Sequence, residues 1–144
     1  RIIKTCRGLM LYVTRREVFS AAHRLFNPNF SDEENDKIYD KCNNTFGHGH
    51  NYILEVTVCG EINPATGYVI DLKKLKRIIK ENIINLVDHK HLNYEVEFLK
   101  GIIPTSENLT IKFWNILENN IDEGTLYSVK LYETENNYFE YRGE

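Results

Sequence analysis

The sequence lacks the features that mark several classes of protein. No apolar run approaches the roughly 20 residues that a membrane-spanning helix needs. The first eleven residues are too short and too mixed in character to form a secretory signal peptide. Lysine and arginine number 18 against 21 acidic residues, so the net charge is −3, which argues against a protein that works on nucleic acid. We therefore expect neither a membrane nor a nucleic acid as a partner.

Cysteine is also scarce. Cys6, Cys42 and Cys59 are an odd number of thiols in no zinc-finger spacing, which fits free cysteines in a reducing compartment. We therefore expect a cytoplasmic protein. The 144 residues are enough for one domain that buries about two-thirds of the surface of its unfolded chain and needs no disulfide for stability.

The most chemically informative segment covers residues 42–50, Cys-Asn-Asn-Thr-Phe-Gly-His-Gly-His. His48 and His50 begin a stretch of β-forming residues, and side chains two apart in a strand project from the same face, roughly 6.5–7 Å apart at the backbone. Two imidazoles so placed can share a metal ion. Gly47 and Gly49 keep the backbone slim where a ligand must approach. A His-x-His pair alone is weak, however, because most such triplets are loop residues without a metal.

A third histidine strengthens the metal hypothesis. His23 ends the run 11–23, which is rich in β-forming residues and predicts a long first strand. If this strand pairs antiparallel with a strand over 48–60, all three histidines fall at one end of a hairpin. Three histidines leave the fourth tetrahedral position open, as in a catalytic rather than a structural zinc site.

Two further positions could carry acid–base chemistry, and each has a simpler structural explanation. Asp88 and His89 place a carboxylate beside an imidazole that titrates near neutrality, although a turn-capping aspartate and a surface histidine are the more frequent arrangement. Cys42 lies in a polar, loop-like setting where nearby cations or a metal could lower its pKa. It could equally be an inert thiol.

Glu133 lies on the apolar side of its predicted strand. A carboxylate on a buried face needs a partner. The partner could be a cation of the protein, or it could be a ligand that donates two hydrogen bonds, such as the amino-pyrimidinone edge of a pterin.

The periodicity of apolar residues predicts an α+β domain of order ββααββ. The expected strands cover residues 11–23, 48–60, 127–133 and 138–141. Ser31 should cap a short helix within 30–39, Asp71 a long helix, and Thr105 or Ser106 a second long helix. The inward positions of the first long helix are Leu72, Leu75, Ile78, Ile79, Ile83 and Leu86.

These elements form a four-stranded antiparallel sheet with both long helices on one face. The other face is either solvated or an oligomer surface. Long sheet edges favour pairing between subunits.

Seven motifs in this order resemble the 6-pyruvoyltetrahydropterin synthase family. They are Phe-Ser-Ala-Ala-His-Arg-Leu (19–25), Ser-Asp-Glu-Glu-Asn (31–35), Lys-Cys-Asn-Asn-x-x-Gly-His-Gly-His-Asn-Tyr (41–52), Gly-Glu-Ile-Asn-Pro-Ala-Thr-Gly (60–67), Leu-Val-Asp-His-Lys (86–90), Pro-Thr-Ser-Glu-Asn (104–108) and Tyr-Glu-Thr-x-Asn-Asn (132–137). The resemblance covers residues 14–144 and leaves 1–13 as an N-terminal extension.

The resemblance implies the tunnelling fold, in which three subunits close their sheets into a barrel. Two such trimers stack into a homohexamer with active sites at the subunit interfaces. It also implies a lyase reaction on the route from GTP to tetrahydrobiopterin. The substrate is 7,8-dihydroneopterin triphosphate, and the products are 6-pyruvoyltetrahydropterin and inorganic triphosphate.

Site roles follow from the same resemblance. One zinc ion per subunit would be held by His23, His48 and His50. Cys42 would be the catalytic base, and Asp88 and His89 would complete a triad with it from the neighbouring subunit. Glu133 would anchor the pterin. The resemblance implies three further residues near the pterin, namely Thr105, Glu107 and Thr134. It also implies Mg²⁺ on the triphosphate of the substrate.

Two positions depart from the usual family pattern. Family members often have Asn and Asp where this chain has His91 and Asn93. His91 adds a titratable group near the expected triad, which affects the pH profile more than the reaction. A tolerated surface substitution is the simpler explanation for it.

Three alternatives remain. In the related 6-carboxytetrahydropterin synthases, which share fold, zinc and substrate, the cysteine usually stands four residues before the His-x-His pair. Here Cys42 stands six before His48, which favours the pyruvoyl enzyme. A non-catalytic binding protein on this scaffold should have lost a ligand or a triad residue, and none is lost. A purely structural zinc needs a fourth protein ligand, which Cys42 would supply unless it lies too far away.

Overall fold

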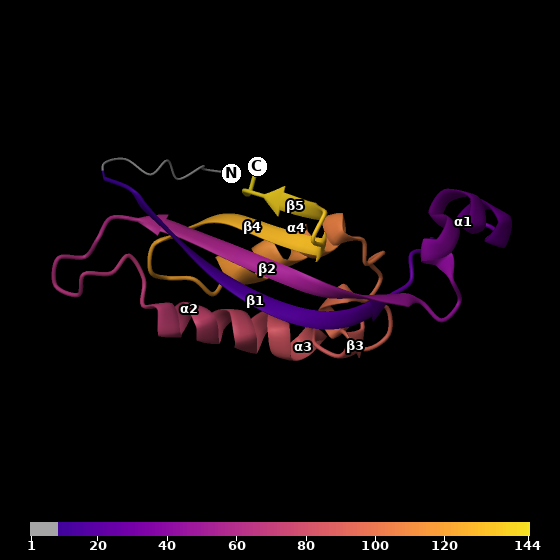
Figure 1. Ribbon diagram of the computed structural model, residues 1–144, viewed down its shortest axis with the longest axis horizontal. Coiled ribbons are helices and arrows are strands. Elements are labelled where there is room, and N and C mark those ends of the chain that lie inside the picture. The colour runs from indigo at the N-terminus through magenta and orange to yellow at the C-terminus, as the bar shows by residue number, and fades with distance from the viewer. Residues whose placement is uncertain (1–8) are drawn as a thin grey trace.

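Two long antiparallel strands form the centre of the molecule (Figure 1). The computed structural model describes residues 9–144, so that Cys6 and most of the expected N-terminal extension lie outside the described part. Strand β1 (Leu11–His23) pairs with β2 (His48–Gly60) along its whole length, and His23 lies opposite His48. Both predicted strands are confirmed.

The sheet has five strands in the order β3-β1-β2-β4-β5. Strand β4 (Thr125–Thr134) pairs antiparallel with β2, and β5 (Asn137–Tyr141) pairs antiparallel with β4. The expectation of four antiparallel strands is wrong in one respect, because β3 (Lys90–His91) adds a short parallel strand beside β1. Two residues are too few to show an alternating pattern in the sequence. Hydrogen bonds of the flanking residues to β1 hold β3 in place.

Three helices begin where the sequence predicts. Helix α1 (Asp32–Tyr39) is capped by Ser31, α2 (Leu72–Ile79) by Asp71, and α4 (Ser106–Glu118) by Thr105. In each case the capping side chain accepts a hydrogen bond from a backbone N–H of the first turn. Helices α2 and α4 cover one face of the sheet, whereas α1 projects beyond the end of the hairpin that carries the histidines (Figure 1).

The core lies between the sheet and these helices. The fully buried strand side chains include Tyr52, Leu54, Val56, Val58, Val129 and Leu131, and the helices contribute Leu75, Ile79, Ile83, Leu109, Phe113 and Leu117. Leu72 and Leu86, predicted to point inward, are exposed. Helix α2 continues as a π-helical turn, η2 (Lys80–Ile84), before the last turn α3 (Asn85–Val87). The wider turn shifts the helical phase, so that Val87 is buried in place of Leu86.

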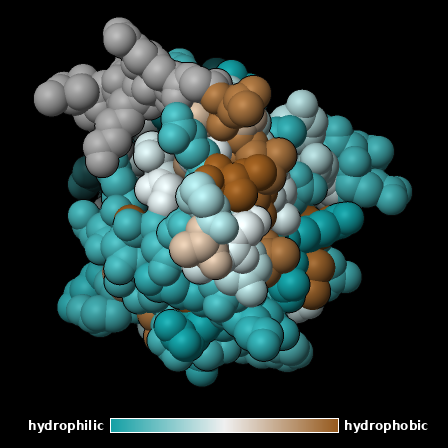
Figure 2. Space-filling view, turned by 90° about the vertical axis from the view of Figure 1, so that its left-hand side faces the viewer, coloured by the Kyte–Doolittle hydropathy of each residue, from teal (hydrophilic) through white to brown (hydrophobic). Residues whose placement is uncertain are grey.

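The end of the hairpin opposite the histidines carries exposed apolar residues. The exposed fractions of Leu9, Leu11 and Ile62 are 93%, 49% and 53%, and Figure 2 shows apolar surface gathered on this end of the molecule. Among residues 9–144, no helix has both the length and the apolar character that crossing a membrane requires.

Candidate active site

Three histidines converge at one end of the β1–β2 hairpin. The register places His23 opposite His48, and the alternation of β2 brings His50 onto the same face. The ring centroids lie 4.6 Å (His23–His48), 5.1 Å (His23–His50) and 4.8 Å (His48–His50) apart. One nitrogen from each residue lies within 4.8 Å of the other two. This histidine cluster confirms that strand pairing brings the three predicted ligands together.

The cluster fits a bound metal ion. His23 Nδ1 donates a hydrogen bond to the carbonyl of Pro104 at 2.8 Å, which leaves the lone pair of its Nε2 directed away from that carbonyl. His23 Nε2 lies 3.0 Å from His48 Nε2, and two nitrogens that share a tetrahedral zinc lie about 3.3 Å apart. The Nε2 atom of His50 is buried and has no hydrogen-bond partner among residues 9–144. A metal ion would satisfy all three nitrogens.

The protonation of the cluster also suits a metal. Burial lowers the pKa of His23 from 6.5 to about 4, and burial likewise lowers the pKa of His50. Both imidazoles are therefore neutral at pH 7, the form that coordinates a cation. Within residues 9–144 the cluster offers three ligands. Three imidazoles with a fourth position open match the donor set of catalytic zinc sites.

Glu133, near the end of β4, borders the cluster. Its Oε2 accepts a hydrogen bond of 2.5 Å from the hydroxyl of Ser106, which is buried in the first turn of α4. Its Oε1 lies 3.9 Å from His50 Nε2. Across the described residues no lysine or arginine pairs with Glu133, so the structural ion pair with a cationic side chain is not formed. The Oε1 atom is left available to a ligand.

The three other residues expected near the pterin lie close by in the fold. Thr105 caps α4 through its Oγ1, and Glu107 lies exposed in the first turn of that helix. Thr134 follows Glu133, and its Oγ1 accepts a hydrogen bond from the N–H of Asn136. Thr105 and Thr134 thus have local structural roles. Contact of the three residues with a substrate stays a prediction.

Cys42 lies in the 3-10 turn η1 (Asp40–Asn43) and is half-buried. Its carbonyl accepts a hydrogen bond of 2.8 Å from the N–H of Leu25. Burial raises the pKa of the Cys42 thiol, and the charges of Glu133 and Asp40 raise it further. Among the described residues no cation lowers this pKa, so the expected effect of neighbouring cations is wrong for these side chains. The effect of Glu133 shows that thiol and carboxylate lie within electrostatic range of each other.

Asp88 and His89 form a pair of contacting side chains at the edge of β1. Asp88 Oδ1 accepts a hydrogen bond from the N–H of Ser20 at 2.9 Å and lies 3.0 Å from His89 Nδ1. The hydrogen bond from Ser20, with a smaller effect from His89, lowers the pKa of Asp88. His89 adopts a left-handed backbone conformation with φ of +60°, and its side chain is 81% exposed. In the described part of the chain, no hydrogen bond joins Cys42 to either residue.

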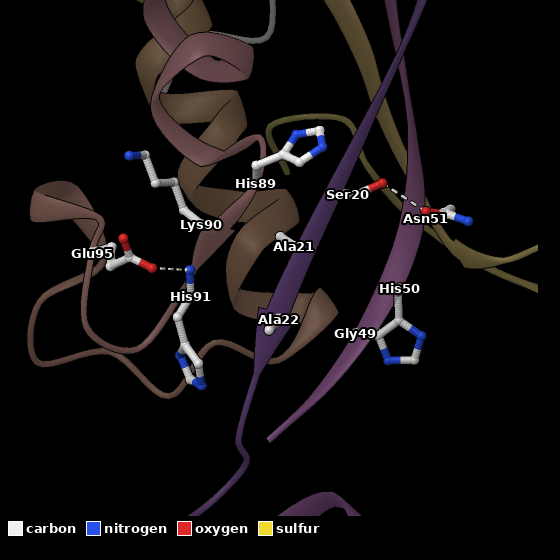
Figure 3. A pocket seen from close by; sticks show the side chains of 10 residues that line it. All are labelled: Ser20, Ala21, Ala22, Gly49, His50, Asn51, His89, Lys90, His91 and Glu95. Carbon is white, nitrogen blue, oxygen red and sulfur yellow. Dashed lines mark hydrogen bonds between the residues drawn. The ribbon is translucent and has the colours of Figure 1, made fainter. Parts of the chain in front are cut away.

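The imidazole of His89 lines an open pocket of about 470 Å³ (Figure 3). The hairpin contributes one wall, which includes Ser20 and Asn51, joined by a hydrogen bond of 2.6 Å. The segment that follows α3 contributes the other wall, which includes His91 and Glu95. Because His89 faces open space in this chain, a group from outside the chain can reach it.

Comparison with known proteins decides the family. A family model described as 6-pyruvoyl tetrahydropterin synthase matches residues 12–144. The chain belongs to the 6-pyruvoyl tetrahydropterin synthase family. The 6-pyruvoyl tetrahydrobiopterin synthase of Homo sapiens is 48% identical over 138 residues, which cover 96% of this chain and 95% of that protein. The structure of Caenorhabditis elegans 6-pyruvoyl tetrahydropterin synthase has a TM-score of 0.90 at 40% identity, covering 97% of this chain and 100% of that chain.

The chain is also similar to a 6-carboxytetrahydropterin synthase, the alternative enzyme considered from the sequence. The 6-carboxy-5,6,7,8-tetrahydropterin synthase of Rickettsia typhi is 31% identical over 149 residues, covering 91% of this chain and 99% of that protein. The similarity to the human 6-pyruvoyl tetrahydrobiopterin synthase is thus the greater of the two.

Sequence reasoning missed several groups around the site. The carbonyl of Pro104 orients His23, and the hydroxyl of Ser106, considered only as a helix cap, holds Glu133. Every residue has a backbone carbonyl, so the sequence gives no sign that the carbonyl of Pro104 binds His23. The only signal for Ser106 was its place beside Thr105 in a motif of the 6-pyruvoyl tetrahydropterin synthase family.

Proposed function

We propose that the protein is a zinc-dependent 6-pyruvoyltetrahydropterin synthase of tetrahydrobiopterin biosynthesis. It would convert 7,8-dihydroneopterin triphosphate to 6-pyruvoyltetrahydropterin with elimination of inorganic triphosphate. The observation that carries this proposal is the cluster of three histidines beside the carboxylate of Glu133. Membership of the 6-pyruvoyl tetrahydropterin synthase family supports it.

Substrate orientation falls to Glu133 in this proposal. The hydrogen bond from the hydroxyl of Ser106 to Oε2 restricts the rotation of the carboxylate. The carboxylate can then accept hydrogen bonds from the ring N–H and the amino group of a pterin, as charged, paired acceptors do. The pterin side chain then extends towards the histidine cluster. Thr105, Glu107 and Thr134 border the same region and would contact the ring.

Proton transfer falls to Cys42, Asp88 and His89. Zinc, held by His23, His48 and His50, would supply a Lewis acid for the hydroxyl groups of the substrate side chain. Cys42 removes a proton from an adjacent carbon, for which its thiol must first lose its own proton. The acceptor of the thiol proton is His89 of a neighbouring subunit, whose imidazole is oriented by Asp88. Substrate atoms equal product atoms plus triphosphate, so no external oxidant is needed.

The same proposal includes the assembly and its setting. We propose a cytoplasmic homohexamer of two stacked trimeric barrels, with Mg²⁺ bound through the substrate triphosphate and residues 14–144 as the enzyme domain. The outer face of the sheet supports an interface, because Val18 and Tyr138 are 64% and 55% exposed there. Among the described residues no hydrogen bond joins Cys42 to Asp88 or His89, which supports the proposal as well. Residues 1–13 would be an extension of this domain.

The direct test is turnover. Pure, zinc-loaded protein is incubated with dihydroneopterin triphosphate, the pterin is analysed by mass spectrometry, and released triphosphate is assayed. A 6-pyruvoyl product with triphosphate release is expected. A 6-carboxypterin with acetaldehyde would instead indicate the activity for which the Rickettsia relative is named. Unchanged substrate would contradict both enzymatic proposals.

A further inference from the structure

The side-chain amide of Asn93 binds the main chain of the first residue after β1. Arg24 directly follows His23 of the histidine cluster, and its N–H donates to Asn93 Oδ1 at 2.8 Å. Asn93 Nδ2 donates in return to the Arg24 carbonyl at 2.8 Å. One side chain thus satisfies both main-chain groups of one residue, as a neighbouring strand would. This pairing continues the β3–β1 contact, in which the N–H of Leu92 donates to the carbonyl of Ala22.

The side chain of Arg24 reaches in the opposite direction, towards the cysteine turn. Its Nε donates to both the carbonyl and Oδ1 of Asn43, each at 3.1 Å. Asn43 is only 7% exposed, and its Nδ2 donates to Asp36 Oδ1 at 2.7 Å. The guanidinium also lies over the ring of Phe26, 4.5 Å from its centroid. The arginine is therefore fixed by packing as well as by hydrogen bonds. We refer to Arg24, Asn43 and Asn93 as the Arg24 clasp.

The clasp connects Cys42 with the histidine cluster by a short route. Asn43 follows Cys42, and the N–H of Leu25 binds the carbonyl of Cys42 itself. Both Arg24 and Leu25 follow His23 in the chain. The backbone of Cys42, from which the thiol projects, is thus held relative to His23 through two residues and through hydrogen bonds at each of them.

We propose that Arg24 and Asn93 are positioning residues that set the place of the Cys42 thiol relative to the histidine cluster. The carboxamide at position 93 is suited to this role, because a carboxylate could accept from the Arg24 N–H but could not donate to its carbonyl. The effect on turnover rests on the proposed function. The effect on thiol geometry does not.

The test compares three variants with the wild type. Asn93→Ala removes both hydrogen bonds to Arg24, Asn93→Asp keeps only the acceptor, and Arg24→Lys keeps the charge but loses the Nε donor to Asn43. Asn119→Ala is the matched control, because its Nδ2 binds the carbonyl of Asn115 at the exposed end of α4, far from the site in the fold. Each zinc-loaded protein is assayed for kcat, KM, zinc content and the rate of Cys42 alkylation by iodoacetamide, followed by peptide mass spectrometry.

Asn93→Ala and Arg24→Lys are expected to lower kcat by about tenfold or more, because small displacements of a reacting group have large effects on rate. KM should stay within about twofold, since the pterin contacts are unchanged. Alkylation of Cys42 should change severalfold in both variants, with Asn93→Asp intermediate, while zinc content and Asn119→Ala stay at wild-type values.

Wild-type kcat and alkylation in both Asn93→Ala and Arg24→Lys would overturn the inference. Loss of zinc in step with kcat would also overturn it, because the clasp would then support the metal ligands rather than the thiol. If Asn93→Ala fails to fold, Arg24→Lys alone decides. If the wild type does not convert dihydroneopterin triphosphate, the proposed function fails, while the alkylation rates still test the clasp.

Discussion

At the scale of single residues, His23 has the most constrained environment of the site. It is buried, it donates to Pro104 through Nδ1, and Nε2 faces His48. Its folded-state pKa of about 4 lies below the ordinary value of 6.5. A histidine with a depressed pKa resists protonation in the folded state and takes up a proton when the chain unfolds.

This difference predicts a pH-dependent stability of the metal-free protein. Between pH 6.5 and about 4, His23 is protonated in the unfolded chain but stays neutral in the folded protein. The free energy of unfolding should therefore fall by about 3 kcal/mol as the pH falls through this range. Below pH 4 this loss should level off. Urea denaturation at stepwise pH measures it. A His23→Gln variant should lose this part of the slope; an unchanged slope would assign it to other groups.

Glu133 predicts a separate effect on ligand affinity. Glu133→Gln keeps the shape of the side chain but removes the charge that would strengthen the proposed hydrogen bonds to a pterin. We expect binding of a non-reactive pterin such as neopterin to weaken by about 10- to 100-fold. Fluorescence titration measures the Kd. Glu135→Gln, in the exposed turn after β4, should bind as the wild type does. Equal affinities in both variants would contradict the anchoring role.

At the scale of elements, the turn into β2 is the tightest part of the site. Gly47 has φ of +78°, and a Cβ there would lie 2.8 Å from the carbonyl oxygen of His23 and 3.0 Å from His91 Nε2. A methyl group at this position must push the 42–48 segment away from β1. Because the segment leads into His48, the displacement would separate two members of the histidine cluster.

Gly47→Ala should therefore lower both stability and zinc content. Gly67 provides a matched control, since its φ is +77° and a Cβ there would contact nothing within 4 Å. Gly67→Ala isolates the backbone strain, about 1–2 kcal/mol, and should retain zinc. Thermal unfolding and metal analysis of the two variants separate strain from steric contact. Similar losses in both would refute the steric argument.

Elements with local signals could be predicted from the sequence. The strands over 11–23 and 48–60 show alternation, and the caps at Ser31 and Asp71 are local choices of residue type, so both were correct. The π-helical turn and β3 depend on contacts made elsewhere in the fold, and they were missed. The same division holds in the site. The histidine cluster follows from strand periodicity, whereas the Ser106–Glu133 hydrogen bond and the Arg24 clasp join segments far apart in sequence.

At the scale of the whole molecule, the proposed assembly predicts shared active sites. If Cys42 and His89 of each site come from different subunits, Cys42→Ala and His89→Ala are each inactive alone. When the two variants are unfolded together in equal amounts and refolded with zinc, about a quarter of the sites should regain activity. Random assembly gives that fraction of sites an intact Cys42 from one subunit and an intact His89 from its neighbour. The assay is the turnover described above. No recovery in a mixture that has the mass of a hexamer would place both residues in one subunit.

The distances along the chain between contacting residues have a consequence for how the molecule forms. His23 and His48 are 25 residues apart, whereas Arg24 and Asn93, which hold the cysteine turn, are 69 apart. Contacts that close a longer loop lose more chain entropy and form more slowly. During refolding we therefore expect the capacity to bind zinc to appear before Cys42 becomes protected from alkylation. A newly made chain would then acquire its metal before it acquires its reactivity.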